Sequence, residues 1–133
     1  MAIPSHETFG WISIAVGLLV GLAIGPGADR ETWLGGYASR PRRLIRLGHI
    51  ACFGLGFINV LFDRAAASLA PSIEGAARVA LLVGSAGLPL ACFGAAFVRP
   101  LKWALPPFAV LVAAAVVALA VSRLLALPPI GSP

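Results

Sequence analysis

Polar and small residues that could take part in chemistry follow one line along the segment 42–64. In a helix, with about 100° per residue, these residues fall within about 80° of one another: His49, Cys52, Gly56, Asn59 and Asp63. Arg42 and Arg46 continue the line at the start of the segment. The segment is long enough to cross a bilayer, and polar groups are costly in lipid. We therefore expect this line to face other protein segments or a cavity, and we look for a functional site along it.

One hypothesis for this line is a cofactor site centred on His49. A histidine within a span can ligate the iron of a b-type haem, with nearby arginines binding the propionates. The same imidazole, with Arg46 or Asn59, could instead hydrogen-bond a quinone carbonyl between helices. The candidate cofactor-binding residues are His49, Arg46, Arg42 and Asn59. Because His6 is expected at the opposite membrane surface, a bis-histidine haem would need a ligand from another subunit.

A second hypothesis is a metal site. Cys52 and Cys92 lie in matching stretches, 51–54 and 91–94, and with His49 they offer three ligands for zinc or copper. A closed tetrahedral site needs a fourth ligand, and the sequence offers none nearby. Two small cysteines buried at a helix crossing explain the pattern more simply, so we expect no metal.

The polar line also has a structural explanation, because membrane helices use histidine and asparagine as interhelical hydrogen-bonding groups worth about 0.6–2 kcal/mol each. Hydrolase motifs do not occur in the sequence, and no carboxylate is expected deep within a span, so we expect no enzyme. The main functional hypothesis is an accessory or structural subunit of a larger membrane complex, such as a respiratory or electron-transfer complex, or of a homo-oligomer. The alternatives are a haem- or quinone-binding electron-transfer subunit and an oligomeric pore or carrier.

The amino-acid composition indicates the class of protein in which these residues lie. Of the 133 residues, 59% are hydrophobic and 11% are charged, whereas soluble domains are about 25% charged. This predicts an all-α integral membrane protein with four transmembrane helices in an antiparallel up-down bundle, folded as a single domain. The spans are expected at about 9–25, 44–62, 77–98 and 107–126. The net charge of +5 does not point to nucleic acid, because no basic soluble surface with interleaved aromatic residues is present.

Glycines at helical spacing predict where the helices pack. Gly17, Gly21 and Gly25 recur every four residues and would form a flat groove on the first span. Gly84 and Gly87 belong to a seam of small residues along the third span. Glycine is also common in membrane helices without any packing function, which is the alternative explanation. The expected partners are membrane lipids and other membrane subunits or further copies of this chain.

The basic residues predict the orientation. Seven of them lie in or beside the first and third connections: Arg30, Arg40, Arg42, Arg43, Arg46, Arg99 and Lys102. The remaining three, Arg64, Arg78 and Arg123, lie at the other side. By the positive-inside rule this predicts a multi-pass protein of a bacterial inner membrane, with both termini in the periplasm. The first apolar stretch follows no Lys or Arg, so we expect it to be a retained span and not a signal peptide.

Overall fold

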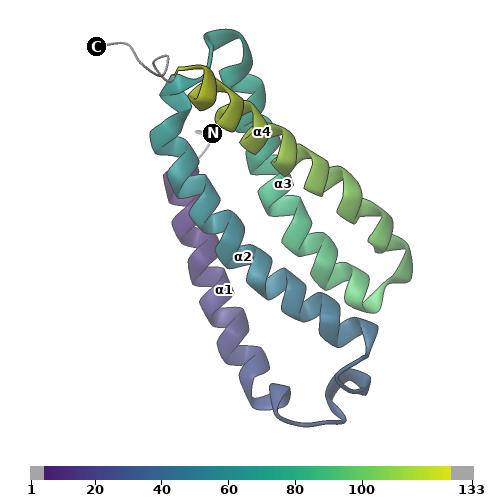
Figure 1. Cartoon of the computed structure of the whole chain (residues 1–133). Coiled ribbons are helices and arrows are strands. Elements are labelled where there is room, and N and C mark those ends of the chain that lie inside the picture. Colours follow the sequence, from purple (N-terminus) through teal and green to yellow (C-terminus); the bar gives the residue numbers. More distant parts are fainter. Residues whose placement is uncertain (1–4, 127–133) are drawn as a thin grey trace.

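The computed structural model describes residues 5–126, and within them the chain is helical throughout apart from short connections (Figure 1). The long helices are α1 (His6–Ala28), α2 (Arg40–Ala65), α3 (Pro71–Phe97) and α4 (Leu105–Leu125). Short 3-10 helices lie in the connections: η1 (Trp33–Gly35), η2 (Ala66–Ser68) and η3 (Arg99–Ala104). All four long helices are apolar and long enough to cross a membrane. The prediction of an all-α chain with four such helices is confirmed.

The four helices run alternately up and down, and each packs mainly against its neighbours in the sequence (Figure 1). Helices α2 and α3 occupy the middle, with α1 packed on α2 and α4 packed on α3. Helices α1 and α4 have no substantial contact with each other. The described residues therefore form an open antiparallel array of four helices.

Side-chain caps start two of the helices. The Ser5 hydroxyl accepts a hydrogen bond from the Thr8 backbone N–H at 3.1 Å, as expected of an N-cap residue before α1. The Ser39 hydroxyl does the same for Arg42 N–H at the start of α2. Helix α1 continues through Pro26 to Ala28, beyond the end predicted at residue 25. The extra turn is stabilised because the Arg42 side chain donates a hydrogen bond to the Ala28 carbonyl.

The apolar core joins α2, α3 and α4 at the end of the molecule that holds η2. Its buried members are Phe62, Ala66, Leu69, Ala77, Leu81 and Ala115. Half of these residues are alanines, so the helices approach closely without large side chains between them. At the same face, Gly84 and Gly87 of α3 lie against Phe108 and Val112 of α4. These two glycines are at the helix contact for which the sequence proposed them.

The closest approach between α1 and α2 is at Gly10 and Gly56. A Cβ atom added to Gly10 would lie 2.6 Å from the Gly56 carbonyl oxygen, and one added to Gly56 would lie 2.9 Å from that of Gly10. The sequence placed the groove of α1 further along, at Gly17, Gly21 and Gly25. Gly17 and Gly21 do face α2 side chains, whereas a Cβ on Gly25 would meet nothing within 4 Å. Gly25 therefore makes no helix contact within the described chain, because α1 and α2 have diverged at that depth.

The substitution Gly56→Ala is expected to destabilise the protein by about 1–3 kcal/mol, because the added methyl group overlaps rigid backbone of α1. The measurement is the free energy of unfolding in detergent micelles. Gly54→Ala is the matched control, since Gly54 lies half a turn away on the same helix with open space around it. It is expected to leave stability unchanged or to raise it slightly. Equal tolerance of both substitutions would contradict the contact at Gly56.

Candidate functional site

The polar line of α2 lies along one face, as the sequence predicted, and divides into separate groups. Cys52, Gly56 and Asn59 are buried between helices, whereas His49 and Asp63 are partly exposed. Different neighbouring elements surround the two ends and the middle of the line. Each group is therefore described from its own contacts.

Asn59 forms the centre of a hydrogen-bond network that joins three helices. Its side chain is 0% exposed. The amide nitrogen donates to the Leu55 carbonyl and to the Ser85 hydroxyl of α3, both at 2.8 Å. The amide oxygen lies 2.7 Å from Nδ1 of His6 on α1 and must accept a hydrogen bond from it, since an amide oxygen cannot donate. Both amide protons are thus used within the protein.

His6 is a member of this network that the sequence reasoning missed. It is 2% exposed, packs against the Phe62 ring and keeps its Nε2 atom buried without a partner among the described residues. The sequence correctly set it far from His49, because His49 lies ten residues, or about 15 Å, before Asn59 on α2. The signal that could have predicted this contact is depth in the membrane. His6 is the first residue of α1, Asn59 lies six residues before the last residue of α2, and these two helix ends lie at the same end of an up-down array.

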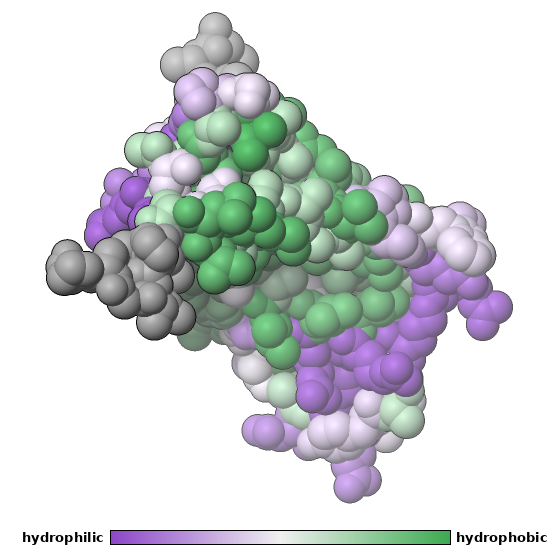
Figure 2. All heavy atoms as spheres, turned by 45° about the horizontal axis from the view of Figure 1, so that its top comes forward, coloured by the Kyte–Doolittle hydropathy of each residue, from purple (hydrophilic) through white to green (hydrophobic). Residues whose placement is uncertain are grey.

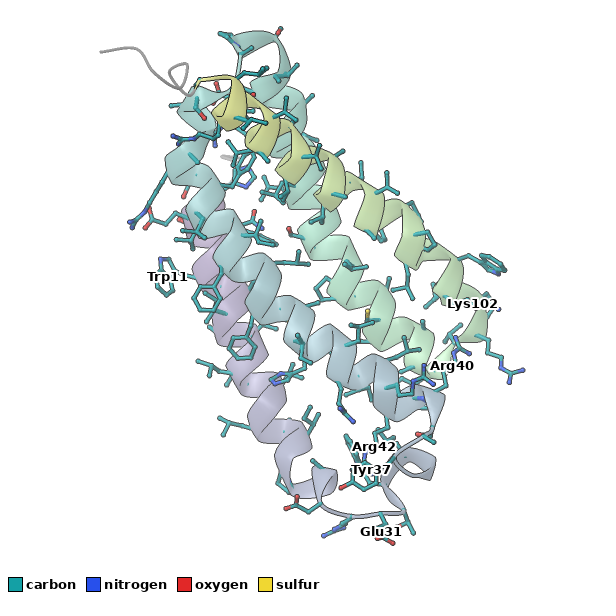
Figure 3. The ribbon with its side chains drawn as sticks, viewed as in Figure 1. Trp11, Glu31, Tyr37, Arg40, Arg42 and Lys102 are labelled. Carbon is teal, nitrogen blue, oxygen red and sulfur yellow. The ribbon has the colours of Figure 1, made fainter. Side chains whose placement is uncertain are left out.

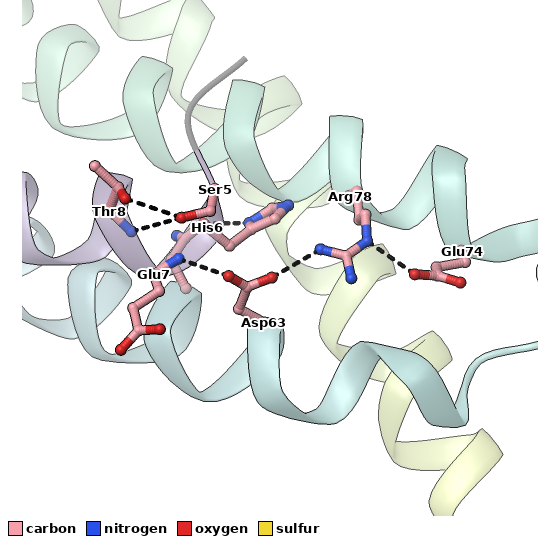
Figure 4. Close-up of polar contacts among 8 residues, drawn as sticks. Ser5, His6, Glu7, Thr8, Asp63, Glu74 and Arg78 are labelled. Atoms are coloured by element: carbon pink, nitrogen blue, oxygen red, sulfur yellow. Dashed lines mark hydrogen bonds and ion pairs between the residues drawn. The ribbon is translucent and has the colours of Figure 1, made fainter. Parts of the chain in front are cut away.

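A chain of ion pairs and hydrogen bonds crosses the helices close to Asn59 (Figure 4). The Asp63 carboxylate accepts a hydrogen bond from the Glu7 backbone N–H at 3.0 Å, in the first turn of α1. Its other oxygen lies 2.9 Å from the Arg78 guanidinium, which also reaches Glu74 at 2.9 Å. The Asp63 charge therefore caps the N-terminus of α1 and attaches α2 to α3. An exposed pair between Arg64 and Glu7, at 3.5 Å, contributes little beside these contacts.

His49 lies between α1 and α2. Its ring meets the Phe53 ring edge-on, with 5.2 Å between the ring centroids. A Cβ atom added to Gly21 of α1 would lie 2.8 Å from the Cε1 atom of His49. The absence of a side chain at Gly21 thus makes room for the imidazole. Nδ1 of His49 is buried and has no hydrogen-bond partner among residues 5–126. Nδ1 is thus a polar atom at the predicted cofactor position whose hydrogen bond the described residues do not supply.

The Arg42 side chain contacts other groups of the protein and does not point into a ligand site. It is 2% exposed and donates hydrogen bonds to the carbonyls of Ala28 and Arg30. Its guanidinium stacks on the Tyr37 ring, 3.7 Å from the centroid, and faces Trp33 at 5.6 Å (Figure 3). A positive charge at the C-terminal end of α1 interacts favourably with the helix dipole. A signal for this contact was present in the sequence. The last turn of α1 has no basic residue of its own to interact with the helix dipole, so a basic residue from elsewhere in the chain was needed there.

The four candidate cofactor residues do not converge on one point. Asn59 belongs to the His6 and Ser85 network, Arg42 to the first connection, and His49 to the interface with α1. Arg46 is exposed on another side of α2, where it lines a groove with a volume of about 630 Å³. Within the described chain, no three His, Cys, Asp or Glu side chains are grouped closely enough to hold a metal ion. His49, Cys52 and Cys92 therefore do not form the three-ligand site considered from the sequence.

Comparison with protein-family models, with curated proteins and with solved structures gave no match to this chain. What the protein does is therefore inferred from the geometry of its own residues.

Arg42→Gln is expected to lower the free energy of unfolding by about 2 kcal/mol, because it removes a charged donor from the Ala28 carbonyl at the end of α1 and from the Arg30 carbonyl in the connection. Limited proteolysis should also cleave the connection between α1 and α2 faster. The neighbouring Arg43→Gln is the control, since Arg43 is exposed and its side chain forms no hydrogen bond with the rest of the described chain. A similar loss in both variants would show that charge alone, and not the Arg42 contacts, stabilises this end.

Proposed function

We propose that this protein is a non-catalytic integral membrane protein that serves as an accessory or structural subunit of a larger membrane assembly or homo-oligomer. The observation that supports this most directly is the use of the polar line on α2. Its most deeply buried side chain, that of Asn59, forms hydrogen bonds with His6, Leu55 and Ser85. Polar side chains that join membrane helices in this way hold the fold together, so Asn59 needs no ligand or substrate to complete its hydrogen bonds.

The open arrangement also supports a function in assembly. Helices α1 and α4 are each covered on one side only, and large apolar side chains such as Leu22 and Leu124 are exposed on them. Between α3 and α4 lies a shallow apolar groove of about 210 Å³, lined by Ile73, Ala76, Ala77, Ala80, Ala114, Ala115 and Ala118. Small residues let transmembrane helices approach closely. We propose that a transmembrane helix of a partner subunit packs here.

We also propose an orientation for the protein in a bacterial inner membrane. The connections α1–α2 and α3–α4 lie at one end of the array, where Arg40 donates to the Arg99 carbonyl at 3.4 Å. This end carries most of the basic residues, so by the positive-inside rule it faces the cytoplasm and both termini face the periplasm. A cysteine introduced at Ala38 would then be labelled only from the cytoplasmic side.

The unpartnered Nδ1 of His49 favours a second candidate, a cofactor-binding electron-transfer subunit. A histidine that ligates iron usually donates its other ring N–H to a protein group, and no such group is present for Nδ1 in the described residues. A quinone carbonyl, which needs only one hydrogen bond, therefore fits this imidazole better than haem does. No comparable observation in residues 5–126 favours a pore or a carrier.

We expect the wild-type protein, extracted from its own membrane in mild detergent, to migrate as an assembly larger than one chain. Ala114→Leu should weaken that assembly about tenfold, because an added isobutyl group fills the groove and costs more than 1 kcal/mol of packing. The readout is the dissociation of the assembly on dilution, followed by its mass in solution. Ala113→Leu, one residue away and outside the groove, is the matched control. A monomeric wild type, or equal effects of both substitutions, would contradict the proposal.

The same preparation decides the second candidate. A structural subunit is expected to be colourless, to release no quinone on solvent extraction, and to keep its assembly in His49→Ala. A reduced-minus-oxidised absorption band, or bound quinone, that disappears in His49→Ala would replace the structural proposal with the electron-transfer one.

A further inference from the structure

The groove beside Arg46 combines basic and apolar side chains in a way that the structural proposal does not use. It has a volume of about 630 Å³ and lies between the first turns of α2 and the 3-10 helix η3. Four of its lining residues are basic and the other three are apolar: Arg40, Arg43, Arg46 and Lys102, then Leu44, Leu47 and Ile50. Arg40 and Lys102 approach this groove from different elements at the same end of the array (Figure 3).

The basic side chains of this groove have no counter-ion among the described residues. All ion pairs within residues 5–126 involve Arg64 or Arg78, at the other end of the array. Arg40 reaches only the Arg99 carbonyl, and Lys102 lies over the Trp103 ring, 4.9 Å from its centroid. Four cations around one groove repel each other unless an anion binds between them. The groove is therefore suited to a ligand with at least one negative charge.

The start of α2 strengthens the requirement for an anion. The N-terminal end of a helix carries a partial positive charge and favours acidic residues, yet the first turn of α2 contains no acidic residue and several arginines. Arg42 is compensated by the carbonyls of α1, but Arg40, Arg43 and Arg46 are not. A local arrangement that costs stability without a compensating contact is typical of a binding site.

The apolar part of the groove selects an amphipathic anion. Leu44, Leu47 and Ile50 follow Arg40 along α2 at about 6 to 15 Å from it, in the direction of the membrane interior. Arg46 begins at the depth of Leu47, and its long side chain can reach back to the charged end. The exposed rings of Trp103 and Tyr37 lie at this end of the molecule, as expected at head-group level. Figure 2 shows hydrophilic surface directly bordering hydrophobic surface over this part of the chain.

We propose that this groove is a binding site for an anionic phospholipid, whose phosphate lies among Arg40, Arg43, Arg46 and Lys102 and whose acyl chain lies along Leu44, Leu47 and Ile50. Basic pockets between transmembrane helices recognise anionic head groups in this way. The site requires that the chain lies in a membrane, but it does not depend on the structural function proposed above or on the orientation.

The experiment titrates lipid into the purified full-length protein in detergent and counts bound lipids by native mass spectrometry. Dioleoylphosphatidylglycerol is expected to bind about tenfold or more tightly than dioleoylphosphatidylcholine, which has the same acyl chains and no net charge. The double substitution Arg43→Gln with Arg46→Gln should weaken phosphatidylglycerol binding about 30-fold, because each basic residue near a membrane surface contributes about a factor of five. Lys102→Gln, on the other element, should weaken it about fivefold.

Matched controls separate this site from general charge effects and from a simple phosphate site. Arg64→Gln with Arg123→Gln removes the same charge from exposed positions at the opposite end and should leave binding unchanged. Excess inorganic phosphate should not displace the lipid. Equal binding of the two lipids, or an equal loss in the control double variant, would overturn the proposal. Complete displacement by inorganic phosphate would overturn it as well, since the groove would then be an anion site without a contribution from the acyl chain.

Discussion

The amide of Asn59 is fully buried within the apolar length of α2, where no solvent could complete its hydrogen bonds. The protein satisfies it internally, and each partner comes from a different place: His6 from α1, Ser85 from α3 and the Leu55 carbonyl from α2 itself. Leaving any of these unmade would leave buried polar atoms without partners, at a cost of about 1–3 kcal/mol each. The network therefore fixes the rotation of three helices about their axes, and most other contacts depend on that rotation.

The close packing of α1 on α2 is one of these dependent features. With Asn59 facing His6, the glycines at positions 10 and 56 meet backbone to backbone one turn away from the network. The Asp63 carboxylate then reaches the first turn of α1 and the Arg78 guanidinium. The contacts of Asn59, Gly56 and Asp63 all lie at one end of the array. Helix α1 is therefore attached to α2 at that end and diverges from it toward Gly25. Arg42 closes the other end by capping the last turn of α1.

The arginines at the start of α2 have two different environments. Arg42 is buried against the rings of Tyr37 and Trp33, and its guanidinium donates hydrogen bonds to the Ala28 and Arg30 carbonyls. Arg43 and Arg46 are exposed, and Arg40 and Lys102 join them around an open groove. The difference lies in the surroundings, because the first connection folds over Arg42, whereas Arg43 and Arg46 border the groove. One part of this arginine cluster thus stabilises the fold, and the other part remains available for an anion.

The sequence determined that the chain is all-α and where its four long apolar helices lie, because hydropathy over 20 residues and the interrupting prolines, glycines and charges are local properties. It also determined that His49, Cys52, Gly56, Asn59 and Asp63 share a face, since that follows from helical periodicity alone. The tertiary structure decided which groups meet across helices: His6 with Asn59, Gly10 with Gly56, and Arg42 with the end of α1. It separated the candidate cofactor residues into different environments and left the four helices as an open array. These outcomes depend on the rotation and depth of each helix relative to its neighbours, and short-range patterns along the chain do not contain that information.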